Sequence, residues 1–424
     1  MGPADADDRA DRCRGVPRRP RAPGAQDRGQ DDPDHRALDR ARARRPLRGH
    51  GGARPAGRRH QEVLRSTVKL SLRTLNRTLL ARQLLLARQE LAVSPAVSHL
   101  VGLQAQTTGP PYLALWSRLH GFRFDDLSDA ITSRALVRMT LMRGTLHLAP
   151  AADCAVLRPV LQPMLTKALL TLHPGLAAIG IEKVVAAAKD VLADGPLPLT
   201  DIGARLRERW PDESERSLYF GAQLLTPMVR VPPSGIWGRS ATSANASFAQ
   251  WIGEDLPETA PAGPMIERYL RAFGPASAAD VAAWSRLTGL RPHINALDLV
   301  RHQDPNGREL LDVPDGELTD EDVPTPVRYL GVYDNVLLSH ADRTRVIAEE
   351  HRKVWGAGKN GVFPQTFLVD GFVRGTWVAE GGTLVLTPYA NVSKKDVAAL
   401  KREGMALLKV LAPDEPHTFT MRPL

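Results

Sequence analysis

The segment ESERSLYFGAQLLTPMVRVPPSGIWG, residues 213–238, contains the pattern that decides the fold. Glu213 to Leu225 has the pattern of a helix, and Pro227 ends it because proline lacks the backbone N–H that a helix needs. Residues 228–231 and 236–238 are short apolar runs on either side of Pro-Pro-Ser-Gly, which predicts strand, turn and strand. A helix followed by a β-hairpin is the second half of a winged helix.

The residues before this segment complete the same unit. Ile181 to Leu192 carries an apolar stripe at helical spacing, and Thr200 is a candidate cap for a further helix. We therefore predict a winged helix over residues 179–262. A second hairpin signal, centred on Arg143-Gly144, follows several helical segments and predicts another winged helix over residues 68–178.

The rest of the chain divides into two further predicted domains. Residues 263–330 resemble a third, fainter winged helix, whose strands we expect at Leu310 to Val313 and Thr325 to Leu330. Residues 331–424 are rich in strand patterns and end in a helical one, which predicts a β-rich C-terminal domain. The predicted fold class is α+β, mainly helical, with tandem winged-helix repeats.

The N-terminal 67 residues differ in composition from everything that follows. They hold 17 of the 56 basic and 10 of the 47 acidic residues, a net charge of +7, so only +2 remains for residues 68–424. Residues 1–60 contain three residues among Val, Leu, Ile and Phe, too few to bury a core. They are either a disordered basic arm or upstream DNA read as coding, and we favour the second, with Val68 as the true start.

Two glutamines stand out in Leu103-Gln104-Ala105-Gln106, which lies between a predicted helix, Ser94 to Leu103, and Gly109-Pro110-Pro111. In extended chain, residues i and i+2 share a side, so both amides can face one spot. An amide is no general base, but a pair of amides can hold a water molecule. The alternative interpretation is two loop glutamines that cap the end of a helix.

The stretch VGLQAQTTGPPYLALWSRL, residues 101–119, resembles the winged-helix DNA glycosylases of the AlkZ/YcaQ group in its Gln-x-Gln form. The resemblance continues at residues 142–147, 333–343 and 368–371, and it spans roughly residues 68–424. It implies a monofunctional DNA glycosylase in which Gln104 and Gln106 are catalytic. Relatives of the AlkZ type remove bulky N7-alkyl purines, including those in interstrand cross-links made by azinomycin-type antibiotics.

An N7-alkylated purine suits a glutamine pair. Such a base is cationic and leaves as a neutral molecule, so it needs little help from a general acid. The sugar develops oxocarbenium character, and a positioned water completes the hydrolysis. We expect double-stranded DNA with an alkylated purine as the partner, and no cofactor or metal ion.

Candidates for DNA contact are local, because the net charge of residues 68–424 is small. We predict Arg143, in the first wing, and Lys353 and Lys359, in a segment whose glycines favour a hairpin tip between strands. Such a tip could reach a groove and contact phosphates. The alternatives are an ordinary wing turn at Arg143 and a solvated loop at the two lysines.

Several other functions lack their sequence signals. The chain has no Gly-x-Ser-x-Gly, His-Glu-x-x-His or Walker A motif, and Cys13 and Cys154 cannot make a disulfide framework. Ser339-His340-Ala341-Asp342 could be a triad fragment, but adjacent residues favour a structural role. No apolar run is long enough for a membrane span, so we expect a cytoplasmic protein. We also expect a monomer. The rival function is a non-enzymatic winged-helix transcriptional regulator.

Overall fold

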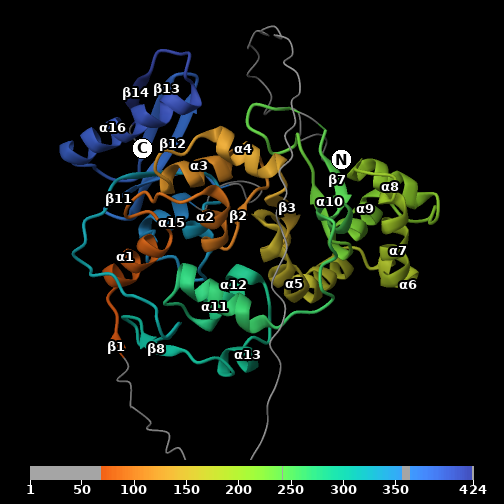
Figure 1. The fold of residues 1–424 in the computed structure, drawn as a ribbon. Helices are drawn as coiled ribbons and strands as arrows, with labels where there is room; N and C mark the ends of the chain where they lie inside the picture. Colours follow the sequence, from red (N-terminus) through yellow and green to blue (C-terminus); the bar gives the residue numbers. More distant parts are fainter. Residues whose placement is uncertain (1–67, 241, 356–362, 423–424) are drawn as a thin grey trace, which may run out of the picture. The chain divides into compact units, whose positions relative to one another are not determined.

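A computed structural model describes residues 68–240, 242–355 and 363–422, all within the unit Val63–Leu424. The predicted N-terminal extension, residues 1–67, lies outside the described residues. Helices and strands alternate along the described chain, and the C-terminal part is the richest in strands (Figure 1).

The first predicted winged-helix unit contains helices that lead into a β-hairpin. Its elements, in chain order, are α1 Leu72–Arg82, α2 Val93–His99, β2 Leu103–Gln104, α3 Gly109–Arg118, α4 Phe124–Thr132, β3 Leu136–Thr140, a 3-10 turn Met142–Gly144 and β4 Leu146–Pro150. The helix predicted to run to Leu103 ends at His99, because Val101 (φ 55°) and Gly102 (φ 86°) adopt left-handed backbone conformations. Gly109-Pro110-Pro111 begins α3, since proline fits the first helical turn.

The second unit follows the long helix α5, Ala151–Leu172. Its elements are α6 Gly175–Ile179, α7 Ile181–Leu192, β5 Leu197–Pro198, α8 Leu199–Arg207, α9 Glu215–Leu225, β6 Met228–Arg230, β7 Ala244–Ser247 and α10 Phe248–Ile252. α7, α8 and α9 pack around one apolar cluster, and they lie together at the right of Figure 1. The second wing strand was predicted at 236–238, which is wrong: β6 pairs with β7 across a longer connection.

One sheet joins the first two units. Its six strands have the order β2-β4-β3-β6-β7-β5, and Arg138 of the first hairpin pairs with Arg230 of the second. Because β2 is the edge strand next to β4, the sheet fixes the position of the Gln-x-Gln segment against the first wing.

The third unit contains α11 Ala262–Phe273, α12 Ala278–Ser285, α13 Arg291–Asn295, β8 Val300–Gln303 and β9 Glu309–Asp312. β8 and β9 form its hairpin, and β1, Val68–Lys69, adds a parallel strand to β8. The predicted strand Thr325 to Leu330 does not complete this unit. Residues 328–330 form β10 of the C-terminal sheet, because their partner is β11.

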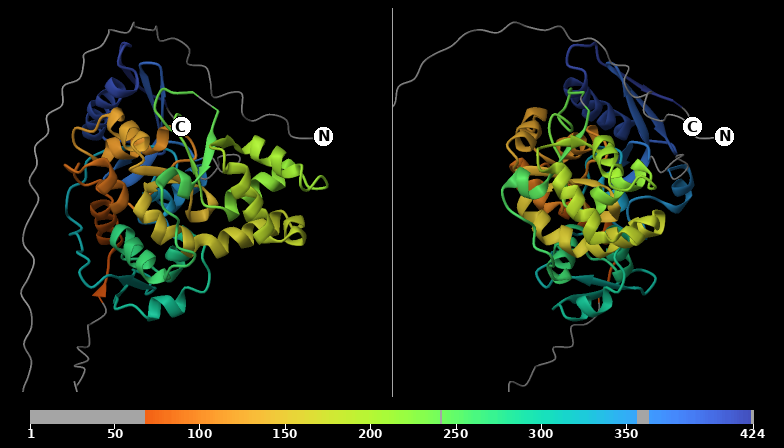
Figure 2. Two further views of the ribbon diagram at one scale, coloured as in Figure 1. Left: turned by 45° about the vertical axis from the view of Figure 1, so that its right-hand side comes forward. Right: turned by 90° about the vertical axis from the view of Figure 1, so that its right-hand side faces the viewer.

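The C-terminal part contains β10 Arg328–Leu330, α14 Asn335–Leu338, α15 Glu349–Trp355, β11 Thr366–Val369, β12 Phe372–Glu380, β13 Thr383–Pro388, α16 Lys394–Leu411 and β14 Thr418–Met421. The strands form one sheet in the order β10-β11-β12-β13-β14. Leu400, Leu407 and Leu408 of α16 share an apolar cluster with Trp377 and Leu384 of the sheet. Figure 2 shows α16 along these strands, in blue. The exact domain boundaries stay a prediction.

Candidate functional site

The Gln-x-Gln segment lies outside the helices: Leu103–Gln104 forms strand β2, and Gln106 lies in the bend that follows it. Gln104 pairs with His147 in the antiparallel ladder of β2 and β4, and the Ala105 N–H donates to the Leu146 carbonyl at 2.7 Å. Leu103 and Ala105, the residues on either side of Gln104, are buried in the core. Gln106 is exposed, whereas Gln104 is only 7% exposed.

Both glutamine side chains have a hydrogen-bond partner on the first wing. The Arg143 Nη2 group donates to Gln104 Oε1 at 2.8 Å, and the Leu146 N–H donates to Gln106 Oε1 at 3.2 Å. A carbonyl oxygen has two lone pairs, so each amide oxygen keeps one acceptor position for another donor. The wing thus orients the two amide groups through their oxygens.

Arg143 lies at the tip of the wing with a left-handed backbone (φ 58°). Its guanidinium turns inward, where Nη1 donates to the Trp284 carbonyl of α12 at 3.0 Å. Burial first, and then the positive charges of Arg286 and Arg343, lower the pKa of Arg143 to about 10. The side chain is therefore still a cation at neutral pH, and it contacts the Gln104 side chain through the hydrogen bond to Oε1.

His147 completes this arrangement as a neutral acceptor. Its Nδ1 group donates to the Thr145 carbonyl at 2.9 Å, so Nε2 is the acceptor that faces Arg143 Nη2 at 3.3 Å. Burial, and the Arg143 charge after it, lower the pKa of His147 to about 3. Its imidazole cannot act as a general acid near neutral pH.

The lowered pKa of His147 predicts a specific loss of stability in acid. The unfolded chain, with a histidine pKa of about 6.5, binds the proton more tightly than the folded protein. Above about pH 6.5, His147 therefore has no effect on the free energy of unfolding. As the pH falls from about 6.5 toward 3, His147 lowers the free energy of unfolding by about 1.4 kcal/mol per pH unit. Between pH 7 and pH 5, urea unfolding should show that the wild type loses about 2 kcal/mol more than His147→Gln.

The His147→Gln comparison has an internal control. His340, whose pKa burial also lowers to about 3, is present in both proteins, so its contribution cancels. Gln at position 147 can still accept a hydrogen bond from Arg143. Equal losses of stability in the two proteins would contradict a neutral, buried His147.

The described residues do not show the three predicted DNA-binding residues as one cluster. Arg143 contacts Gln104 and the Trp284 carbonyl. Lys353 belongs to helix α15, so the predicted hairpin does not begin there, and Lys359 lies outside the described residues. The hairpin prediction is wrong for its first residues because Glu349–Trp355 has helical hydrogen bonding.

Ser339 and His340 belong to a buried hydrogen-bond network. His340 Nε2 donates to the Phe273 carbonyl at 3.1 Å, which leaves Nδ1 to accept from Ser339 Oγ at 2.8 Å. Asp280 accepts from the Ala341 N–H at 2.9 Å and ties α12 to the same segment. These contacts match the structural interpretation of the motif.

No group of three His, Cys, Asp or Glu side chains able to hold a metal ion is found within the described ranges.

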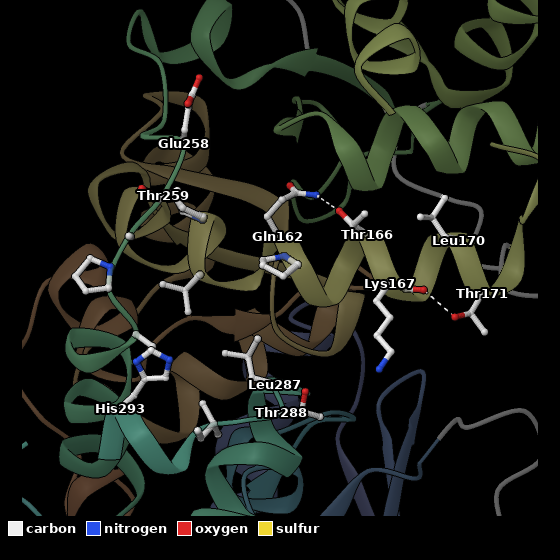
Figure 3. Close-up of a pocket in the computed structure, with 17 residues that line it drawn as sticks. Gln162, Thr166, Lys167, Leu170, Thr171, Glu258, Thr259, Leu287, Thr288 and His293 are labelled. Carbon is white, nitrogen blue, oxygen red and sulfur yellow. Dashed lines mark hydrogen bonds between the residues drawn. The ribbon is translucent and has the colours of Figure 1, made fainter. Parts of the chain in front are cut away.

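A cavity of about 1050 Å³ lies between α5, residues 258–262 and the region around α13 (Figure 3). Gln162 and Lys167 of α5 and His293 of α13 are among the side chains that line it. Neither Gln104 nor Gln106 lines this cavity.

The described helices include none that is long and apolar enough for a membrane crossing.

Sequence reasoning missed three kinds of contact at this site. It did not assign the inward direction of Arg143, the neutral His147, or the contacts of Asp334 and Asn335 with the segments on both sides of the glutamines. A signal was present, because His147 and Asp334-Asn335 lie within two of the stretches that carried the family resemblance, residues 142–147 and 333–343.

Comparisons with known proteins agree on one family. The family model "DNA glycosylase AlkZ-like" matches residues 97–410. The chain is similar to the interstrand DNA cross-link repair glycosylase of Streptomyces sahachiroi, with 25% identity over 346 residues that cover 76% of this chain and 92% of that protein. Among solved structures, the S. sahachiroi DNA glycosylase AlkZ matches with a TM-score of 0.71 and 22% identity, over 84% of this chain and all of that one.

Proposed function

Since this chain belongs to the family of AlkZ-like DNA glycosylases, we propose that it hydrolyses the N-glycosidic bond of N7-alkylated purines in double-stranded DNA. We extend the proposal to interstrand cross-links, in keeping with the name of the S. sahachiroi relative. The observation that carries the proposal is the glutamine pair itself. Gln104 ends strand β2, Gln106 lies in the bend after it, and each amide oxygen accepts a hydrogen bond from the first wing.

The glutamines contribute positioning and polarity. An amide does not titrate, so the pair cannot take the proton from water, but its oxygens can hold the water at the anomeric carbon. The electron pair of the C–N bond leaves with the cationic base, which becomes neutral, and the water that adds to the sugar loses its proton to solvent. The same oxygens carry partial negative charge toward the sugar, which becomes positive as the bond breaks. This chemistry is sufficient only where the departing base is already activated, as a cationic N7-alkyl purine is.

Arg143 sets a condition on this mechanism. A buried cation next to a developing sugar cation is unfavourable unless negative charge compensates it. The phosphates of bound DNA supply that charge, so the site reaches its working electrostatics only in the complex. Arg143 orients Gln104 and also needs the negative charge of DNA nearby. The predicted role of Arg143 in DNA binding therefore remains part of this proposal.

A base-release assay tests the function. A duplex that contains N7-methylguanine, incubated with the purified protein, should yield free N7-methylguanine and an abasic site that heat and alkali cleave. The same duplex without the modification is the control. The yield should not depend on the flanking sequence, because the reactive feature is the lesion.

The rival function predicts different results in the same experiments. A winged-helix regulator would bind one duplex sequence selectively and release no base. For cross-links, a duplex joined through the N7 atoms of two guanines should become two separable strands on a denaturing gel. Failure to release any alkylated purine would contradict the proposed substrate.

We expect Lys353 and Lys359 to contribute to the salt dependence of DNA binding. Replacing Lys353 and Lys359 by alanine should weaken binding about equally for different duplex sequences, since phosphates carry no sequence information. The slope of log K against log salt concentration should fall by roughly one to two units. Fluorescence anisotropy at several salt concentrations measures both effects.

Lys394 and Lys395, exposed at the start of α16, provide a matched control. Their replacement by alanine removes the same charge from another surface and should leave the slope within half a unit, roughly, of the wild type. If the two double variants change the slope equally, the 353–359 segment is not a specific DNA contact.

A further inference from the structure

Two adjacent residues of the C-terminal part, Asp334 and Asn335, contact the chain on both sides of the Gln-x-Gln segment. We propose that Asn335 is a positioning residue for Gln104: it clamps the left-handed turn from which β2 begins. This inference rests on the proposed role of Gln104, and it adds a residue more than 230 positions away along the sequence.

The turn before β2 needs an external support. Val101 has φ 55°, a region that a β-branched residue rarely adopts, and Gly102 follows with φ 86°. Gly102 also lies close to its neighbours, since a Cβ built there would meet the Leu148 carbonyl oxygen at 3.2 Å. The turn is buried, and Gln104 follows it after a single residue. A change in the turn therefore moves Gln104 directly.

Asn335 supplies the support. Its Nδ2 group donates to the Leu100 carbonyl at 3.1 Å and to the Gly102 carbonyl at 3.0 Å. These two carbonyls flank Val101, so the amide holds the chain on both sides of the strained residue. Asparagine is suited to this task because one nitrogen carries two hydrogens in a fixed plane. Aspartate has the same shape but donates neither bond.

Asp334 fixes Asn335 in turn. Asp334 caps α14 through the Val336 N–H at 3.2 Å. Both of its oxygens accept from Arg118, at 2.8 Å each, and Arg118 is the last residue of α3. Because α3 begins just after the glutamines, the Asp334-Asn335 pair fixes the segment before Gln104 and the helix after Gln106 with one rigid element.

The test compares two variants of Asn335 and one control variant in three measurements: the rate of base release, the Kd for DNA and amide hydrogen exchange. Asn335→Ala and Asn335→Asp should each lower the single-turnover rate of base release about fivefold or more, with the Kd for the same duplex within about twofold of the wild type. Amide hydrogen exchange of the free protein should become at least tenfold faster in the peptide that covers residues 100–106. Asn335→Asp separates hydrogen bonding from space filling, because a side chain that only filled space would tolerate it.

Asn76→Ala is the matched control. Asn76 of α1 also donates two hydrogen bonds from Nδ2 to carbonyls, those of Arg345 at 2.6 Å and Gly371 at 2.8 Å, and it is fully buried. Its loss should lower the melting temperature while the rate, measured well below that temperature, and the exchange of residues 100–106 stay at the wild-type values.

The outcomes separate this inference from the proposed function. Unchanged exchange in both Asn335 variants would overturn the clamp, and faster exchange with an unchanged rate would overturn its role in positioning Gln104. If the wild type released no alkylated base at all, the proposed function would fail, and the exchange measurement alone would still decide whether Asn335 holds the turn.

Discussion

Gln104→Ala and Gln106→Ala should each lower the single-turnover rate of base release at least tenfold, which corresponds to about 1.4 kcal/mol of barrier. The reason is that each variant removes one of the two oriented amide oxygens that we place at the water and the sugar. Affinity for the damaged duplex should change little, since phosphate contacts dominate it. Rapid-quench kinetics at saturating enzyme measure the rate, and anisotropy measures the affinity.

The control for this prediction is Gln250→Ala, which removes an exposed glutamine on α10, outside the proposed site. It should keep the wild-type rate. Full activity in both Gln104→Ala and Gln106→Ala would show that the pair does not take part in the reaction, whatever its geometry.

The two glutamine variants should differ in stability. Gln104 is buried and accepts a hydrogen bond from the cation Arg143, so its removal leaves a buried donor without this partner. Such a loss costs about 1–3 kcal/mol. Gln106 is exposed and accepts from a neutral donor, the Leu146 N–H at 3.2 Å, so its removal should cost less than the loss of a hydrogen bond to a charged group. The rates of both variants should therefore be measured at a temperature where each remains folded.

Local patterns were enough to predict the non-helical exit at the glutamines and the first wing, although the helix before them ends at His99 and not at Leu103. The alternation around Arg143-Gly144 is typical of a hairpin. The direction of the Arg143 side chain was beyond such patterns. It depends on the Trp284 carbonyl of α12 and on Gln104, which meet Arg143 only after the first and third units have packed together.

The errors in the second and third wings have a related cause. Ile236 to Gly238 has the composition of a strand, but the partner of β6 is Ala244–Ser247, a segment with little apolar pattern. Strand pairing depends on neighbours in space more than on the residues of one strand. Likewise, the short strand Arg328–Leu330 carries no local signal for either sheet, and its pairing with β11 places it in the C-terminal sheet.

The catalytic role of the glutamines was inferred from a family resemblance and stays a prediction, to which the structure adds two hydrogen bonds that the sequence could not provide. From the residues alone, two loop glutamines at a helix end were the favoured interpretation. The hydrogen bonds from Arg143 and Leu146 now give each amide a fixed orientation. Asn335 was even less visible, because no local pattern connects it with carbonyls that precede it by more than 230 residues.

The buried ion pair of Arg118 and Asp334 predicts the largest effect on stability. Both side chains are fully buried, and two hydrogen bonds of 2.8 Å join them. Asp334→Asn keeps the shape but leaves the guanidinium without a compensating charge, which should cost about 3–5 kcal/mol in the free energy of unfolding. Urea unfolding at constant pH measures this cost.

Two further variants decide whether charge or packing causes the loss. Arg207→Ala breaks an exposed ion pair with Glu215, of 3.2 Å, and should cost less than about 1 kcal/mol because water screens such pairs. Arg118→Met combined with Asp334→Leu removes both buried charges and should recover part of the stability lost in Asp334→Asn. If Asp334→Asn cost no more than Arg207→Ala, the ion pair would not be what holds α3 to α14, and the segment around the glutamines would depend on Asn335 and apolar packing instead.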